Sequence, residues 1–105
     1  MDFLKIGPSE DFDSPRMRVL TFVGKQVGVW READGQWRAM EMICRHQNGD
    51  LSRGKREGDI ITCPRHGWRY DLSTGACLTK PWAYLRRYEV REEEGTLFLS
   101  RSPLR

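Results

Sequence analysis

Short stretches of alternating apolar and polar residues, separated by turn-forming residues, run along much of this chain. Alternation over a few residues is typical of strands with one buried face. We therefore expect strands over residues 16–23, 26–31, 37–43, 85–91 and 96–100.

Glycine-containing pairs predict how these strands are connected. Three such pairs separate expected strands: Gly24-Lys25, Asp34-Gly35 and Glu94-Gly95. Asp-Gly between alternating stretches is a strong hairpin signal. No stretch has a convincing helical period, and the ten glycines and five prolines are spread throughout. The pattern predicts an all-β fold, an antiparallel sandwich or barrel.

The segment of about residues 42–82 differs from the stretches on either side. It contains several turn signals, such as Asn48-Gly49, and most of the residues with metal-binding chemistry. We interpret it as a small subdomain inserted into a β base domain, which would be formed by about residues 1–41 and 83–105. With 105 residues, the whole chain is expected to be a single domain.

Composition excludes some classes of protein. Hydrophobic content of 38% and charged content of 31% fit a soluble globular protein, and no segment is apolar enough to span a bilayer. Residues 1–8 lack the apolar run of a secretory signal, and three cysteines cannot all pair. We therefore expect no membrane association and a reducing, cytoplasmic location.

The net charge of +3 raises the question of nucleic-acid binding. The basic residues are scattered among 15 acidic ones, without a basic helix or arm, so we expect no nucleic-acid partner. We expect the charge to select a protein partner instead.

Two short segments carry the candidate chemistry: Cys44-Arg45-His46 and Cys63-Pro64-Arg65-His66-Gly67. They contain both histidines of the chain and two of its three cysteines. Two sulfur and two nitrogen donors suit either tetrahedral zinc or an iron–sulfur cluster in which histidines replace two cysteines on one iron. The third cysteine, Cys77, is expected to be a small buried hydrophobic residue.

The order of the donors favours the cluster. Zinc sites of the finger type usually present a pair of cysteines and then a pair of histidines. Here each segment contains one of each, which suits two facing loops that each supply one ligand to each of two irons. Zinc, or a coincidence of two Cys/His pairs, stays an alternative on spacing alone.

These segments resemble the ligand loops of Rieske [2Fe–2S] proteins. The resemblance continues through Trp68-Arg69-Tyr70-Asp71, Ser73-Thr74-Gly75 and Pro81. It implies a Rieske-type antiparallel β fold, with one [2Fe–2S] cluster per chain at the tip of the small subdomain. It also implies ligand pairs and neighbours as follows: Cys44 and Cys63 on one iron, His46 and His66 on the other, and Gly67, Trp68, Tyr70 and Pro81 around them.

Several residues depart from one branch of the family, which indicates the kind of Rieske protein that this chain does not resemble. Rieske subunits of respiratory and photosynthetic cytochrome complexes have a disulfide between their ligand loops, at the positions of Gly49 and Arg65, and a membrane anchor. The serine that donates to a cluster sulfur there is Trp68 here. We therefore expect no role in quinol oxidation and a reduction potential in the low part of the Rieske range. Tyr70 could donate its hydroxyl to a cysteine sulfur or simply pack under the loop.

The stretch from His66 to Asp71 is most similar to the Rieske domain of ring-hydroxylating oxygenases. Those enzymes continue into a domain with a mononuclear iron, whereas here we expect no further domain after residue 105, and no histidine remains for a second iron. We therefore expect a free-standing ferredoxin rather than an enzyme, with a flavin-dependent reductase and a terminal oxygenase as redox partners. One departure is that oxygenase ferredoxins are commonly acidic, whereas this chain is basic.

Two other functions stay open. The chain could be a small Rieske-like subunit of an assimilatory nitrite reductase, or a regulatory or structural module that binds zinc or a cluster. An electron carrier needs no small-molecule substrate pocket, so we expect none.

The partner is expected to approach the tip of the small subdomain, where the histidines would lie. Trp82, close to the ligands in sequence, could either contact that partner or pack in the core. Residues 42–82 contain seven Lys or Arg against four Asp or Glu, so the partner is expected to present an acidic patch.

Overall fold

Three antiparallel sheets form the described part of the chain, residues 2–13, 17–45 and 49–104 of a computed structural model. The predicted all-β antiparallel fold is confirmed. The first sheet has the order β1-β10-β9 and contains β1 (Phe3–Pro8), β10 (Thr96–Ser100) and β9 (Val90–Glu93). The second has the order β2-β3-β4-β8 and contains β2 (Arg18–Phe22), β3 (Lys25–Arg31), β4 (Trp37–Glu41) and β8 (Arg87–Tyr88). The third has the order β5-β6-β7 and contains β5 (Lys55–Glu57), β6 (Ile60–Thr62) and β7 (Arg69–Asp71).

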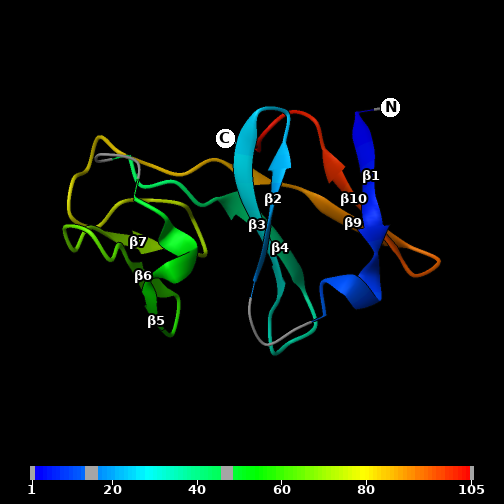
Figure 1. Ribbon diagram of the computed structural model, residues 1–105, viewed down its shortest axis with the longest axis horizontal. Coiled ribbons are helices and arrows are strands. Elements are labelled where there is room, and N and C mark those ends of the chain that lie inside the picture. Colours follow the sequence, from blue (N-terminus) through cyan, green and yellow to red (C-terminus); the bar gives the residue numbers. More distant parts are fainter. Residues whose placement is uncertain (1, 14–16, 46–48, 105) are drawn as a thin grey trace.

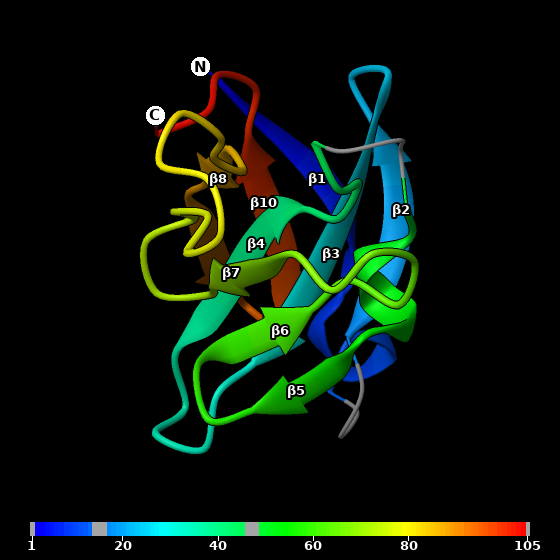
Figure 2. The same ribbon diagram turned by 90° about the vertical axis from the view of Figure 1, so that its left-hand side faces the viewer.

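The third sheet and its loops lie to one side of the other two sheets (Figure 1). We call residues 42–82 the small lobe and the rest of the chain the base. Seen from the lobe side, β5, β6 and β7 lie in front of β3 and β4 (Figure 2). The helices of the described residues are the short 3-10 turns Ser9–Asp11 and Leu51–Arg53, so none could cross a membrane.

Strand β3 is buried on both faces, which explains its run of four buried residues from Val27 to Trp30. Val27 and Val29 point into a core shared with Leu97 of the first sheet. Trp30 points to the opposite face, into a core shared with the small lobe. Because successive strand residues face opposite sides, one strand contributes to both cores.

Glycine allows the small-lobe core to approach β3 closely. A Cβ atom on Gly28 would lie 2.7 Å from Cγ of Met42 and 2.8 Å from Sδ of Met17. A larger residue would therefore force Met17 of the base or Met42 of the lobe to move, since their side chains occupy the space.

Two of the predicted hairpins are confirmed and a third is displaced. Asp34 and Gly35 lie between β3 and β4, and Glu94-Gly95 connects β9 to β10 with positive φ angles of 51° and 76°. The first turn is formed by Val23 and Gly24 rather than by Gly24 and Lys25, since Lys25 pairs with Phe22 across the strands.

The single strand predicted over residues 85–91 is wrong. Arg87 and Tyr88 pair with β4, whereas Val90 to Glu93 pair with β10 in the other sheet. Glu89 lies at the change of sheet, where its backbone N–H donates to the hydroxyl of Ser100. This strand therefore connects the two sheets of the base instead of belonging to one.

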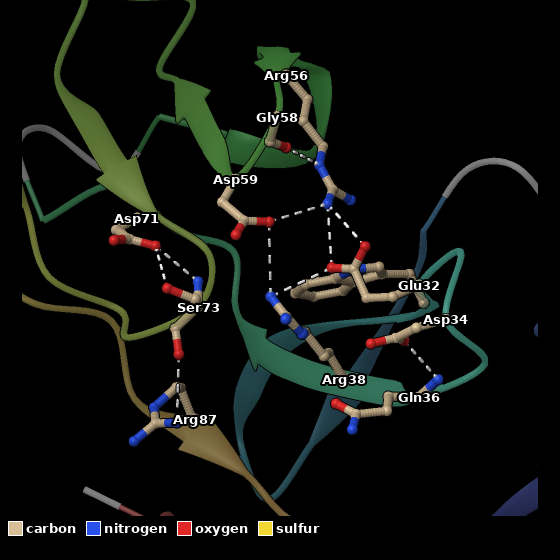
Figure 3. A network of polar contacts seen from close by, with 11 residues as sticks. Glu32, Asp34, Gln36, Arg38, Arg56, Gly58, Asp59, Asp71, Ser73 and Arg87 are labelled. Carbon is tan, nitrogen blue, oxygen red and sulfur yellow. Dashed lines mark hydrogen bonds and ion pairs between the residues drawn. The ribbon is translucent and has the colours of Figure 1, made fainter.

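Charged side chains hold the small lobe against the base (Figure 3). Glu32, after β3, accepts hydrogen bonds from Nη2 of Arg56 at 2.9 and 3.0 Å and from Nε1 of Trp30 at 2.9 Å. Arg38 on β4 lies 3.2 Å from Glu32 and 3.8 Å from Asp59 of the lobe. The network therefore fixes the β5–β6 hairpin to the β3–β4 hairpin.

Candidate metal centre

We call residues 44–49, which follow β4, the first ligand loop, because the sequence predicts cluster ligands in it. The N–H of Cys44 donates to the carbonyl of Gly49 at 2.8 Å, and the N–H of Leu51 donates to the carbonyl of Met42 at 2.9 Å. These bonds close the loop at its base. The side chain of Cys44 is 1% exposed. His46 lies outside the described residues.

The second ligand loop, residues 63–67, connects β6 to β7. The N–H of Cys63 donates to the carbonyl of Trp68 at 2.7 Å, and Gly67 donates back to the carbonyl of Cys63 at 3.1 Å. Gly67 has a φ of 77°, a left-handed conformation that glycine adopts without strain. The loop buries Cys63, which is 2% exposed, and leaves the side chain of His66 exposed.

The two loops meet at Gly49. A Cβ atom on this residue would lie 2.6 Å from Sγ of Cys63 and 3.3 Å from Cγ and Cδ of Arg65. Real Cβ atoms do not approach a sulfur so closely, so the first loop can reach the second only with glycine here. The sulfur of Cys63 therefore lies against the residue whose carbonyl binds the N–H of Cys44.

Tyr70, on β7, connects the first loop to the buried core of the lobe. Its hydroxyl lies 3.3 Å from Sγ of Cys44 and accepts a hydrogen bond from the N–H of Arg45 at 2.9 Å. The side chain is fully buried. Burial, together with the contact to Cys44, raises the pKa of Tyr70 well above its ordinary value. The hydroxyl therefore stays protonated and can donate to the sulfur.

The other aromatic residues beside the loops differ in burial. Trp68 is 9% exposed, whereas Trp82 is 68% exposed, so the core position considered for Trp82 is wrong. The two indole rings make an edge-to-face contact with centroids 5.7 Å apart. Pro81 is exposed beside Trp82.

Cys77 is buried, as expected. Its Sγ atom lies 3.3 Å from the backbone N–H of Lys80, which donates to it. This thiol therefore stabilises the turn that leads to Pro81 and Trp82, and it has a structural use that does not require a metal.

The donor set fits a two-iron cluster. Two buried thiols on adjoining loops, with a tyrosine hydroxyl at one of them, provide a desolvated sulfur environment. In the described residues no three His, Cys, Asp or Glu side chains gather where they could hold one ion. A two-iron cluster does not require this, because each iron takes only two protein ligands.

A cleft of about 830 Å³ lies away from both ligand loops, between the base and the lobe. Its lining includes three arginines, Arg31, Arg53 and Arg56. Each guanidinium lies within 3.7 Å of a carboxylate of this chain. The charges of the cleft are therefore already compensated within the protein.

Sequence reasoning missed the packing role of two glycines. The sequence marks Gly49 as part of the Asn48-Gly49 turn signal and as the place of an absent disulfide, but neither observation predicts how closely it approaches Cys63. Gly75 has a φ of 84°, and a Cβ atom there would collide with the carbonyl oxygen of Leu85. This close approach lets the turn after β7 pack against the chain that returns to the base.

Comparison with known proteins identifies the family. A family model described as the Rieske [2Fe-2S] domain matches residues 2–89. The oxygenase component of 3-ketosteroid-9-alpha-monooxygenase from Rhodococcus rhodochrous is 30% identical over 105 residues, which cover 93% of this chain and 27% of that protein. Oxidoreductase NdmD from Pseudomonas putida is 28% identical, over 89% of this chain and 17% of that protein. The chain therefore spans about a quarter or less of the length of these relatives.

Among the solved structures, some similar chains match over nearly their whole length and others over only a part of it. One, from a complex of reduced oxygenase and oxidized ferredoxin in carbazole 1,9a-dioxygenase, is 30% identical with a TM-score of 0.79, and the match covers 97% of this chain and 95% of that one. Another, from the reduced complex of the same system, is 25% identical with a TM-score of 0.79, and only 28% of it is covered. A putative NADH-dependent nitrite reductase small subunit from Mycobacterium tuberculosis shares the fold, with 22% identity, a TM-score of 0.77 and 95% coverage of each chain.

Proposed function

This chain belongs to the Rieske [2Fe–2S] family, and on that premise we propose that it carries single electrons from a reductase to a terminal oxygenase. The family carries a [2Fe–2S] cluster, which makes this chain an electron-transfer protein in the broad sense. The direction of transfer and the identity of both partners belong to the proposal.

We propose that Cys44 and Cys63 bind one iron and that His46 and His66 bind the other. The observation that carries this assignment is the meeting of the two loops at Gly49, which brings the buried sulfur of Cys63 against the base of the loop that begins with Cys44. Cys77 is not a ligand in this proposal, because its sulfur accepts a hydrogen bond within its own turn.

A cluster held by two thiolates and two neutral imidazoles supplies one-electron chemistry at a higher potential than an all-thiolate cluster. The chain contributes the environment of that chemistry. Cys44 and Cys63 are buried, Tyr70 holds a hydroxyl at one sulfur, and His66 is exposed. An exposed imidazole edge gives a partner protein a short path to the site without a substrate pocket.

The similarity to a chain of similar length in an oxygenase–ferredoxin complex supports an oxygenase as the acceptor. A second candidate is the small subunit of a nitrite reductase, which the shared fold and the similar length of the mycobacterial protein support. Since that similarity is of fold alone, we place the oxygenase first.

Metal analysis and electron paramagnetic resonance of the purified protein test the assignment. Two irons per chain and a Rieske signal after reduction are expected, and zinc without iron would refute it. Alanine variants of the four ligands should lose the signal, whereas Cys77→Ser, the matched control, should keep it. The ligand variants are Cys44→Ala, His46→Ala, Cys63→Ala and His66→Ala.

Reoxidation experiments test the direction of transfer. The reduced protein is mixed rapidly with three candidate acceptors: the oxygenases of carbazole 1,9a-dioxygenase and of 3-ketosteroid-9-alpha-monooxygenase, and the large subunit of an assimilatory nitrite reductase. Fast reoxidation by an oxygenase supports the first candidate, and reoxidation by the nitrite reductase alone supports the second. If none reoxidises the protein, the proposed carrier function fails.

A further inference from the structure

The small lobe exposes two large apolar side chains close together in the chain. Trp82 is 68% exposed and Leu78 is 51% exposed. Trp82 is the most exposed of the large apolar residues in the described part of the chain. Single exposed apolar residues are common on protein surfaces, so exposure alone does not indicate a binding site.

The segment that carries these side chains is held in place by β7 and by Trp68, the residue before it. The N–H of Leu78 donates to the carbonyl of Arg69 at 2.7 Å, and the N–H of Arg69 donates to the hydroxyl of Thr79 at 3.0 Å. The indole of Trp82 contacts the edge or face of the buried Trp68 at a centroid distance of 5.7 Å. An exposed ring that is already ordered loses little conformational entropy when a partner covers it.

The charges of the small lobe are sorted along its sheet. The strand register of β5, β6 and β7 pairs residues in rows across the sheet. The row next to Cys63 contains Lys55, Thr62 and Arg69. The row at the other end of the same strands is Glu57, Ile60 and Asp71. The sheet therefore has two cations at the end near the ligand loops and two carboxylates at the end far from them.

Ion pairs among the described residues involve only two of the basic residues of the small lobe. Of the seven basic residues of the lobe, Arg53 and Arg56 have carboxylate partners, Asp50 and Asp59 among them. Asp71 accepts hydrogen bonds from the N–H and hydroxyl of Ser73. The remaining basic residues are all exposed, and none has an ion pair within the described ranges; we call them the loop cations: Arg45, Lys55, Arg65, Arg69 and Lys80.

We infer that Trp82, with Leu78 on the same segment, is the apolar anchor through which the small lobe docks on its electron acceptor. The inference rests on the proposed carrier function and gives it a specific contact. The acceptor would present an apolar pocket bordered by carboxylates, which complement the loop cations. Aromatic residues that fill a pocket inside a charged rim account for much of the affinity of many protein interfaces.

A second copy of this chain is a poor occupant of the same surface. In a two-fold dimer the same patch meets itself, so the loop cations of one copy would face those of the other. Like charges across an interface are unfavourable. Charge complementarity therefore favours an acidic partner over self-association.

The test uses the holoprotein and the acceptor that reoxidises the wild type fastest. We expect Trp82→Ala to lower the second-order rate constant about tenfold or more, as for an interface hot spot, and Trp82→Phe to restore most of it. The limiting rate at saturating acceptor should be unchanged, as should the visible spectrum of the cluster. Leu104→Ala, which removes a 54% exposed side chain from the base, is the matched control and should have no effect.

Salt distinguishes an apolar anchor from a charged contact. The defect of Trp82→Ala should persist from about 0.01 M to about 1 M ionic strength, over which charge effects are screened. The defect of Lys80→Glu should shrink over the same range.

Three results would overturn the anchor while leaving the carrier function intact. They are an unchanged second-order rate constant in Trp82→Ala, an altered cluster spectrum in that variant, and a wild-type dimer that Trp82→Ala dissociates in sedimentation experiments. If no acceptor reoxidises the wild type, the carrier function itself fails, and the anchor fails with it.

Discussion

The hydroxyl oxygen of Tyr70 lies 3.3 Å from the sulfur of Cys44, although the two residues are separated by 26 positions in the chain. The same oxygen accepts a hydrogen bond from the N–H of Arg45. The hydroxyl proton is therefore available to the sulfur. A thiolate ligand can only accept this bond, so Tyr70 would be the donor when the site is loaded.

Removing this hydroxyl should lower the reduction potential of the cluster. A hydrogen bond to a ligand sulfur favours the more negative, reduced state. We expect Tyr70→Phe to shift the midpoint by roughly −60 mV, which is about a tenfold change in the equilibrium for one electron. A redox titration followed by visible absorption measures the shift.

The control for this variant is Tyr88→Phe, which removes a hydroxyl from the base and should leave the midpoint unchanged. Tyr88 is buried in the other core, at 6% exposure. An unshifted midpoint in Tyr70→Phe would show that the ring only packs under the loop.

Adding one methyl group at Gly49 should prevent the two ligand loops from meeting. Because the Cβ atom would lie 2.6 Å from Sγ of Cys63, the sulfur or the whole loop must move. We expect Gly49→Ala to reduce the iron content per chain to less than about half, since small misplacements of ligands are costly in a preorganised site. Iron and protein assays on the purified variant measure this.

Gly58→Ala is the matched variant for this experiment. Gly58 has a φ of 60° in the β5–β6 turn, and a Cβ atom there would meet nothing within 4 Å. The substitution should cost about 1 kcal/mol of stability through the left-handed backbone alone and should leave the iron content unchanged. Full iron content in Gly49→Ala would contradict the close contact between the loops.

Part of this arrangement could be predicted from the sequence. The hairpins at Asp34-Gly35 and Glu94-Gly95 were predictable because both signals are local. Strand β1 was missed because its partner, β10, lies at the other end of the chain. Strand β5 was missed because all three of its residues are exposed, so it has no alternation of apolar and polar positions.

The sequence predicts which residue types would form the candidate centre, but it does not predict their contacts. The Cys and His spacing indicated the donors, and Tyr70 stood out as a possible hydroxyl donor. Its distance to Cys44 depends on how β7 lies against the first ligand loop, which no local pattern specifies. The ion pair of Glu32 with Arg56 likewise joins a residue of the base to a residue of the small lobe.

Glu32 should make the stability of the protein depend on pH. Burial raises the pKa of this carboxyl, but bonds from Trp30 and Arg56 and the charges of Arg56 and Arg38 outweigh burial and lower it below the ordinary 4.5. A lowered pKa in the folded state contributes stability that is present above about pH 4.5 and is lost as the pH falls through the folded value.

We therefore expect Glu32→Gln to lower the free energy of unfolding at pH 7 by on the order of 1 kcal/mol. The difference from the wild type should shrink as the pH falls below 4.5. Denaturant unfolding of the holoprotein at several pH values measures it. Glu57→Gln, at an exposed carboxylate of the lobe, is the control, and equal losses in both variants would contradict a specific role of Glu32.

Reversing the charge of Arg65 should slow electron transfer at low ionic strength. The residue is exposed, and its aliphatic carbons lie over Gly49. Glutamate also has an aliphatic chain, so Arg65→Glu keeps aliphatic carbons over Gly49 while reversing the charge. Charges at an interface chiefly affect the rate of encounter, so the deficit should shrink as salt is added. Stopped-flow reoxidation by the acceptor measures the rate.

Arg101→Glu makes the same change of charge on the base and should have no comparable effect, since Arg101 lies outside the small lobe. The cluster spectrum of Arg65→Glu should stay intact. If the rate is unchanged at low salt, or if the cluster is lost, Arg65 has no role in docking.

Ligation by histidine is the central claim of this account, and isotope labelling tests it most directly. The chain contains only two histidines, so growth with ¹⁵N-histidine labels the two proposed nitrogen ligands and no other side chain. Pulsed electron paramagnetic resonance of the reduced protein should show two strongly coupled nitrogens whose hyperfine couplings change on labelling. A paramagnetic cluster without histidine nitrogen couplings, or one coupled nitrogen only, would contradict the proposed ligand set.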